Sequence, residues 1–184
     1  MDMSTTTFIS NQNPRADFHL AHALTKLLQK HFPMCRQLVF FCIGTPNISG
    51  DTLGPAIGSQ LYRLHLPSVF VYGTEDAPVH ALNLANTWER AKRRHPNACF
   101  IAIDASFGEK RFLGNICLER GPIYPGRGVG KDLPCVGDIS ITGILCRKCR
   151  RRMRELEKVG EEEVQRQANI ITHGIFQSII YFFL

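Results

Sequence analysis

The chain has 184 residues, of which 44% are hydrophobic and 21% charged, so its composition excludes a disordered chain and a coiled-coil rod. Its net charge is +6, and six basic residues fall in the segment 147–154 (RKCRRRMR), outside which the charges balance. No apolar stretch reaches the roughly 20 residues that span a bilayer, and the first ten residues lack the features of a secretory signal. We therefore expect a cytoplasmic protein without membrane contact.

The N-terminal residues 1–14 are polar and end in Asn-Pro, which predicts a flexible arm. A single domain is expected over 15–184. It opens with a helix whose apolar residues recur at helical spacing, with Asp17 as N-cap and Pro33 as the stop.

Short apolar runs then alternate with helical segments along the chain. The run 38–43 (LVFFCI) is continuously apolar, which is typical of a strand buried on both faces of a parallel sheet. Strands are expected at 38–43, 69–72, 99–103, 112–118 and 135–141, and further helices at 53–65 and 78–94.

The C-terminal region 145–184 is expected to be helical, with a break near Gly160. Alternating strands and helices predict an α/β domain with a mostly parallel sheet and helices on both faces. In such sheets, binding sites lie beyond the carboxyl ends of the strands.

Acidic residues follow three of the expected strands. Asp51 closes the loop 44–51 (GTPNISGD), Asp104 directly follows the strand 99–103, and Asp138 lies near the end of the last strand. Two carboxylates in one cleft would push one pKa up, which suits acid–base chemistry. Alternatively, Asp51 is an N-cap, Asp104 a turn residue and Asp138 a strand-end cap.

A glycine-rich loop carries Gly126, Gly128, Gly130 and Lys131. It is not a Walker A loop, because Pro125 and Asp132 stand where that motif needs Gly and Ser or Thr. The sequence also lacks a dinucleotide-binding G-x-G-x-x-G after a strand and a G-x-S-x-G nucleophile elbow. No nucleotide cofactor is expected.

Three segments, in this order, resemble the YyaC family of sporulation proteins: Asn47-x-x-x-Asp51-x-Leu53-Gly54-Pro55, Ile103-Asp104-Ala105 and Pro125-Gly126-x-Gly128-Val129-Gly130. The match covers about residues 36–144. More distantly, the same segments are similar to the spore germination protease and to hydrogenase maturation endopeptidases.

This resemblance implies a three-layer phosphorylase/hydrolase-like domain that cleaves a peptide bond through Asp51 and Asp104. Asn47, His80 and Asp138 are candidate supporting residues, and Lys131 with the backbone of the glycine loop is a candidate oxyanion site. The endopeptidases add a nickel-binding histidine near that loop, where this chain has Tyr124 and Arg127, so we expect no metal.

The expected partner is a protein or peptide substrate, such as a spore protein. The alternative is an inactive binding module on the same fold. The basic run could contact nucleic acid, but a solvated helical face is the favoured interpretation, so nucleic acid is not an expected partner.

The seven cysteines are an odd number without scaffold spacing, which predicts reduced thiols. Cys146 and Cys149 form a CxxC pair, but a zinc site would need a second pair.

Overall fold

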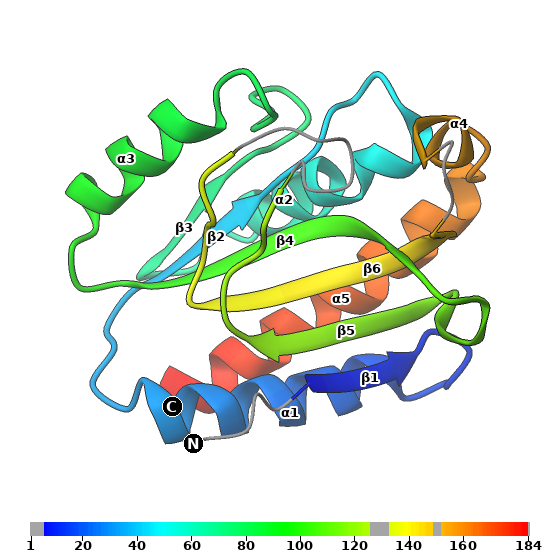
Figure 1. The fold of residues 1–184 in the computed structure, drawn as a ribbon. Helices are drawn as coiled ribbons and strands as arrows, with labels where there is room; N and C mark the ends of the chain where they lie inside the picture. The colour runs from blue at the N-terminus through cyan, green and yellow to red at the C-terminus, as the bar shows by residue number, and fades with distance from the viewer. Residues whose placement is uncertain (1–5, 126–132, 149–151, 184) are drawn as a thin grey trace.

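The computed structural model describes residues 6–125, 133–148 and 152–183. It contains one six-stranded sheet with helices on both faces (Figure 1). The prediction of an α/β domain with a mostly parallel sheet is therefore confirmed. From one edge to the other, the strands are β1 (Thr6–Ser10), β5 (Asn115–Arg120), β6 (Ile139–Arg147), β4 (Cys99–Gly108), β2 (Leu38–Cys42) and β3 (Val69–Tyr72).

The four strands β3, β2, β4 and β6 are parallel to one another, whereas β5 runs antiparallel to β6 and β1 antiparallel to β5. Helices α1 (Ala16–His31), α2 (Leu53–Arg63) and α5 (Glu161–Phe183) cover one face. Helix α3 (Leu84–Arg94) covers the other. The short helix α4 (Arg152–Glu157) packs near β6 and the 3₁₀ turn η1 (Ser49–Thr52).

The central strand β2 explains why its sequence is continuously apolar. Side chains alternate between the two faces of a strand, so Phe40 packs under α1, α2 and α5 while Phe41 packs under α3. Both side chains are fully buried. A strand covered by helices on both sides needs apolar residues at every position.

Residues 6–10 are not part of a flexible arm, which corrects the sequence prediction for that segment. They form β1, which pairs antiparallel with β5 from Thr6–Glu119 to Ser10–Asn115. The segment is rich in the β-branched residues that favour strands. Its structure depends on a partner more than 100 residues away, which a local pattern does not reveal.

Two further boundaries differ from the prediction. Helix α3 begins at Leu84 rather than at Pro78, because Val79 pairs with Ile43 at the sheet and Asn83 precedes the helix as its N-cap. The last strand begins at Ile139 and runs to Arg147, so residues 145–147 are strand rather than helix.

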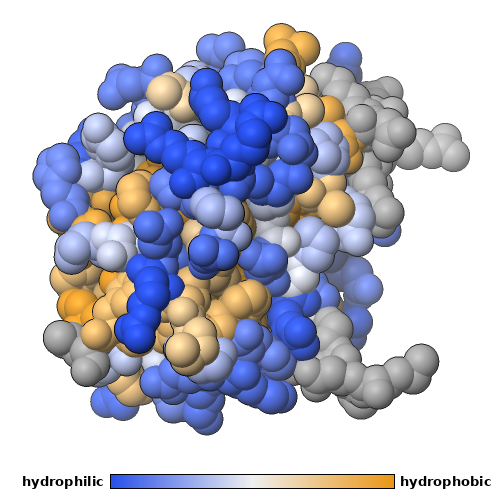
Figure 2. Space-filling model, turned by 90° about the vertical axis from the view of Figure 1, so that its left-hand side faces the viewer, coloured by the Kyte–Doolittle hydropathy of each residue, from blue (hydrophilic) through white to orange (hydrophobic). Residues whose placement is uncertain are grey.

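The C-terminal region is helical from Arg152 onward, and it is interrupted at Gly160 as predicted. None of the described helices is long and apolar enough to span a membrane. Figure 2 views the side on which α3 lies: hydrophilic side chains gather over this helix, and hydrophobic ones gather below it, where α1 and α5 end.

Candidate functional site

A cavity of about 720 Å³ opens at the carboxyl ends of the parallel strands, where such sheets place their binding sites. It is lined by both predicted acids, together with Asn47 and His80. The two acids come from separate segments: Asp51 lies in η1 and Asp104 in β4. The sheet therefore brings together the residues that the sequence analysis singled out at this edge.

Asp104 lies inside β4 rather than after it, which corrects the predicted strand end. Its position is nevertheless special, because the pairing of β2 with β4 ends at Cys42 and Ile103. From Asp104 onward β4 pairs with β6 alone on the described sheet, starting at Thr142. The early end of β2 leaves room for the cavity beside the Asp104 side chain.

The pKa of Asp104 is raised well above its usual range. Burial is the main cause, because it penalises the charged carboxylate, and the negative charge of Asp51 raises the pKa further. A hydrogen bond from the Ala105 backbone N–H opposes these effects. Asp104 therefore tends to hold its proton while Asp51 is charged.

Asp51 is held by a hydrogen bond from the Thr45 backbone N–H to its Oδ2, at 2.9 Å. It is not the N-cap of α2, a position that Thr52 occupies. Burial raises the pKa of Asp51 above its usual range, and the Thr45 hydrogen bond and the charge of His80 oppose this effect only in part. Since two groups favour its charged form, Asp51 is the acid of the pair more suited to carry the negative charge.

Two glycines allow α2 and the loop before it to sit directly on the end of β2. A Cβ on Gly54 would lie 2.0 Å from the Ile43 carbonyl oxygen. A Cβ on Gly44, whose φ is +150°, would lie 2.1 Å from the Asp51 carbonyl oxygen. Gly44 and Gly54, on either side of Asp51 in the sequence, therefore fix it at the sheet edge through close backbone contact.

His80 is half-buried and precedes α3. Its backbone N–H donates to Asn83 Oδ1 at 2.9 Å, and its Nδ1 accepts from the Leu82 N–H at 3.3 Å. Its charge acts on Asp51, as described above. The candidate supporting residue His80 thus lies at the cavity, and it precedes α3 instead of lying within the helix expected over 78–94.

Asp138 does not belong to this site, because it precedes β6 instead of ending it. Its backbone N–H donates to the Phe100 carbonyl oxygen at 2.7 Å, and its Oδ2 accepts from the Phe100 N–H at 2.9 Å. Both contacts lie at the start of β4. Asp104 is four residues further along, or about 13 Å at the usual rise per strand residue.

The glycine loop lies outside the described residues, including Gly126, Gly128, Gly130 and Lys131. The same holds for Cys149 of the CxxC pair. The other half of that pair, Cys146, is buried in β6.

The sequence analysis missed several polar residues that line the cavity. Lys148 follows β6 directly, and its backbone N–H donates to the Gly108 carbonyl oxygen at 2.9 Å. It belongs to the basic run that was interpreted as a solvated face. The rule that sites lie at carboxyl strand ends would have found it, had the strand been extended to Arg147. The others are Thr45, Ser106 and Thr142.

Among the described residues, no group of three or more His, Cys, Asp or Glu side chains could hold a metal ion. The two carboxyl groups of the cavity, with the imidazole of His80 beside them, are suited to acid–base chemistry.

Comparison with known proteins identifies the family. The model of the family described as "Protein of unknown function (DUF1256)" matches residues 8–174. The protein YyaC of Bacillus subtilis (strain 168) is 33% identical over 168 residues, which are 91% of this chain and 81% of YyaC. The chain belongs to the DUF1256 family. The suspected relationship to YyaC is thereby confirmed.

Among solved structures, the comparison matches the [NiFe] hydrogenase maturation protease HycI from Thermococcus kodakarensis KOD1. It has a TM-score of 0.41 and 15% sequence identity, and the match covers 79% of this chain and 98% of HycI. At this degree of similarity, the function of this DUF1256 chain must be argued from its own residues.

Proposed function

We propose that this DUF1256 chain is a peptidase that hydrolyses a peptide bond through Asp51 and Asp104. The observation that supports this proposal most is the pair itself. Both acids line one cavity, and the charge of Asp51 helps to raise the pKa of Asp104 well above its usual range. Two carboxyl groups with separated pKa values can act as base and acid at the same pH.

In this mechanism the Asp51 carboxylate takes a proton from a water molecule, and the water oxygen attacks the scissile carbonyl carbon. Protonated Asp104 donates its hydrogen bond to the carbonyl oxygen as negative charge develops there. The proton held by Asp51 then passes to the amine, the C–N bond breaks, and a carboxylic acid and an amine are released. The atoms balance with water as the only co-reactant.

A cation near the developing negative charge would lower the barrier further. Among the described lysines and arginines, Lys148 lines the cavity. It is an exposed residue. It is a candidate for this role beside Lys131 and the backbone of the glycine loop, which lie outside the described residues.

The substrate class that fits the proposal is a protein or peptide, and the resemblance to the YyaC family suggests a spore protein. For the same reason we place the activity in the cytoplasm of the sporulating cell or in the forespore. Asn47 is exposed at the cavity and is a candidate for orienting the substrate backbone.

The proposal is tested with peptides prepared from a spore protein extract, incubated with the wild type and with Asp51→Asn and Asp104→Asn variants. New termini are identified by mass spectrometry. We expect cleavage by the wild type and its loss in both variants, since an amide keeps the shape of the side chain but not its acid–base function. Equal cleavage by all three proteins would remove the assignment.

The second candidate is an inactive binding module on the same fold, which the same experiment separates. Its supporting observation is that the cavity is also apolar, with Ile43, Leu82 and Leu84 in its lining. A wild type that retains peptides from the extract and cleaves none of them would favour this module.

A further inference from the structure

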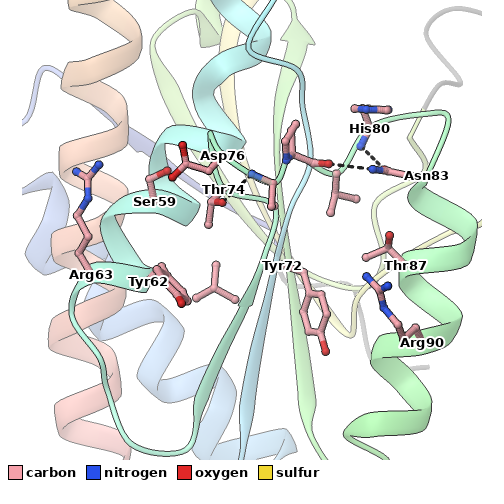
Figure 3. A pocket seen from close by; sticks show the side chains of 15 residues that line it. Ser59, Tyr62, Arg63, Tyr72, Thr74, Asp76, His80, Asn83, Thr87 and Arg90 are labelled. Atoms are coloured by element: carbon pink, nitrogen blue, oxygen red, sulfur yellow. Dashed lines mark hydrogen bonds between the residues drawn. The ribbon is translucent and has the colours of Figure 1, made fainter.

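The edge strand β3 lies at the bottom of a groove. β3 is the last strand in the order of the described sheet, with β2 on one side. Two cavities of about 660 and 550 Å³ follow it, and both are lined by Tyr62, Val71 and Tyr72. In Figure 3, residues of α2 and α3 stand on either side of this strand, among them Tyr62 and Thr87.

The backbone of β3 offers hydrogen-bonding groups to this groove. In the parallel pair, the Leu38 N–H donates to the Ser68 carbonyl oxygen at 3.0 Å. Backbone groups of alternate residues face the same side of a strand, so those of Ser68, Phe70 and Tyr72 face β2. The N–H and C=O of Val71 therefore face the groove, where an extended peptide could pair with them.

The walls of the groove are basic. Arg63 at the end of α2 and Arg90 and Arg94 on α3 line the two cavities, and all three are exposed. None of them takes part in an ion pair among the described residues. The acidic side chain in these linings is Asp76. The charge of the groove thus complements an acidic occupant.

The groove adjoins the cavity that holds the two acids. His80 lines both, so it stands where they meet. Beyond the end of β3, Val79 takes over the sheet edge: it pairs with Ile43, and its carbonyl oxygen accepts from the Gly44 N–H at 2.9 Å. A peptide on the outer edge of β3 lies three strand spacings, roughly 14 Å, from β4, so it must turn at His80 to bring a bond to Asp51 and Asp104.

We infer that β3 and the arginines beside it dock an extended, acidic segment of a protein substrate, which pairs with the Val71 backbone and leads its scissile bond past His80 into the cavity. The inference rests on the proposed peptidase function and names the substrate class of that site. The backbone pairing selects an extended conformation, and the three arginines select glutamate or aspartate side chains.

Binding is measured by fluorescence anisotropy with a labelled octapeptide in which two glutamates alternate with two valines, so that glutamate side chains point toward both α2 and α3 when the peptide is extended. The Asp104→Asn protein is used, so that cleavage does not interfere. We expect Arg63→Gln and Arg90→Gln each to weaken binding about fivefold, as for exposed ion pairs. Arg93→Gln is the matched control, since Arg93 is exposed on α3 but lines neither cavity. It should stay within about twofold.

The pairing between the Val71 backbone and the peptide is tested by a change in the protein and by a change in the peptide. Val71→Pro removes the outward N–H, which an edge strand tolerates, and should weaken binding at least about tenfold. If this variant is not folded by circular dichroism, a peptide N-methylated at every residue, which leaves neither edge with N–H groups, asks the same question of the folded protein. Binding of the N-methylated peptide, or of a lysine–valine peptide, as tight as that of the original would overturn the inference.

The two proposals fail in different ways. Selective binding with no cleavage by the wild type would leave the groove in place and reject the peptidase. Cleavage at the wild-type kcat/KM by Val71→Pro and Arg90→Gln would leave the peptidase in place and reject the groove.

Discussion

The two ends of the parallel sheet each hold an aspartate from the sequence analysis: Asp138 lies beside the first residues of β4, and Asp104 lies in β4 where the pairing with β2 ends. At the amino end, Asp138 is exposed and accepts a hydrogen bond from the Phe100 N–H, where the pairing of β4 with β6 begins. At the carboxyl end, Asp104 faces a cavity beside a second acid, and burial raises its pKa. A position near a strand end is therefore not enough to identify a candidate catalytic acid. Burial and a second carboxylate nearby distinguish Asp104 from the structural Asp138.

The largest expected effect is on peptidase activity, and it distinguishes an aspartate-to-asparagine substitution at Asp104 from the same substitution at Asp138. Asp104→Asn should lower kcat/KM for a cleaved peptide by about 10²–10⁴-fold, the usual contribution of an acid–base group. Asp138→Asn should stay within about twofold, since the amide oxygen can still accept the Phe100 hydrogen bond. Comparable losses in both variants would erase the distinction between the two ends.

The second effect concerns stability. It comes from the close contact between the backbone of Gly54 and the Ile43 carbonyl oxygen, at the carboxyl end of β2. Gly54→Ala should lower the free energy of unfolding by about 2–3 kcal/mol, because the new methyl group meets the Ile43 carbonyl oxygen. Urea denaturation measures this. Gly160→Ala is the control, since nothing lies within 4 Å of a Cβ there, and it should lower stability by at most about 1 kcal/mol, the usual effect of alanine at a helix N-cap.

A third effect is pH-dependent. Because the native pKa of Asp104 is raised, the native state keeps a proton that the unfolded chain has released, and this costs stability as pH rises above the ordinary aspartate range. Asp104→Asn removes that cost. The variant should therefore match the wild type near pH 4 and exceed it near pH 8, by about 1.4 kcal/mol for each unit of pKa elevation. Thermal unfolding at both pH values would show it; a variant less stable than the wild type at pH 8 would contradict the account.

The smallest effect is expected at the amino end. Asp138→Ala removes the acceptor of the Phe100 N–H and should lower the free energy of unfolding by about 1 kcal/mol. Asp138→Asn, which keeps an acceptor, is the matched control. A loss of several kcal/mol would mean that this end contributes more than one hydrogen bond.

The fold class and the carboxyl-end acids could be predicted because they depend on local patterns. The continuously apolar β2 and the acid in the loop after it are visible in the sequence. Asp138 was placed at the wrong end because the strand was expected to begin at Cys135, whereas Gly137 adopts a φ of +94° and the strand begins at Ile139. Strand boundaries set by such turns decide which end of a sheet a residue occupies.

Other features depend on contacts between distant segments. β1 requires β5 as its partner, and Val79 joins the sheet only because Ile43 lies beside it. The place of Lys148 in the cavity likewise follows from how far β6 extends. None of these contacts leaves a periodic signal in its own segment.

The central claim is that Asp51 and Asp104 act on each other within one cavity. NMR titration of aspartate side-chain carboxyl ¹³C resonances, in the wild type and in Asp51→Asn, tests this most directly. We predict that the pKa of Asp104 is raised in the wild type and falls in the variant, because a neighbouring negative charge has been removed. An Asp104 titration that is identical in both proteins would contradict the claim.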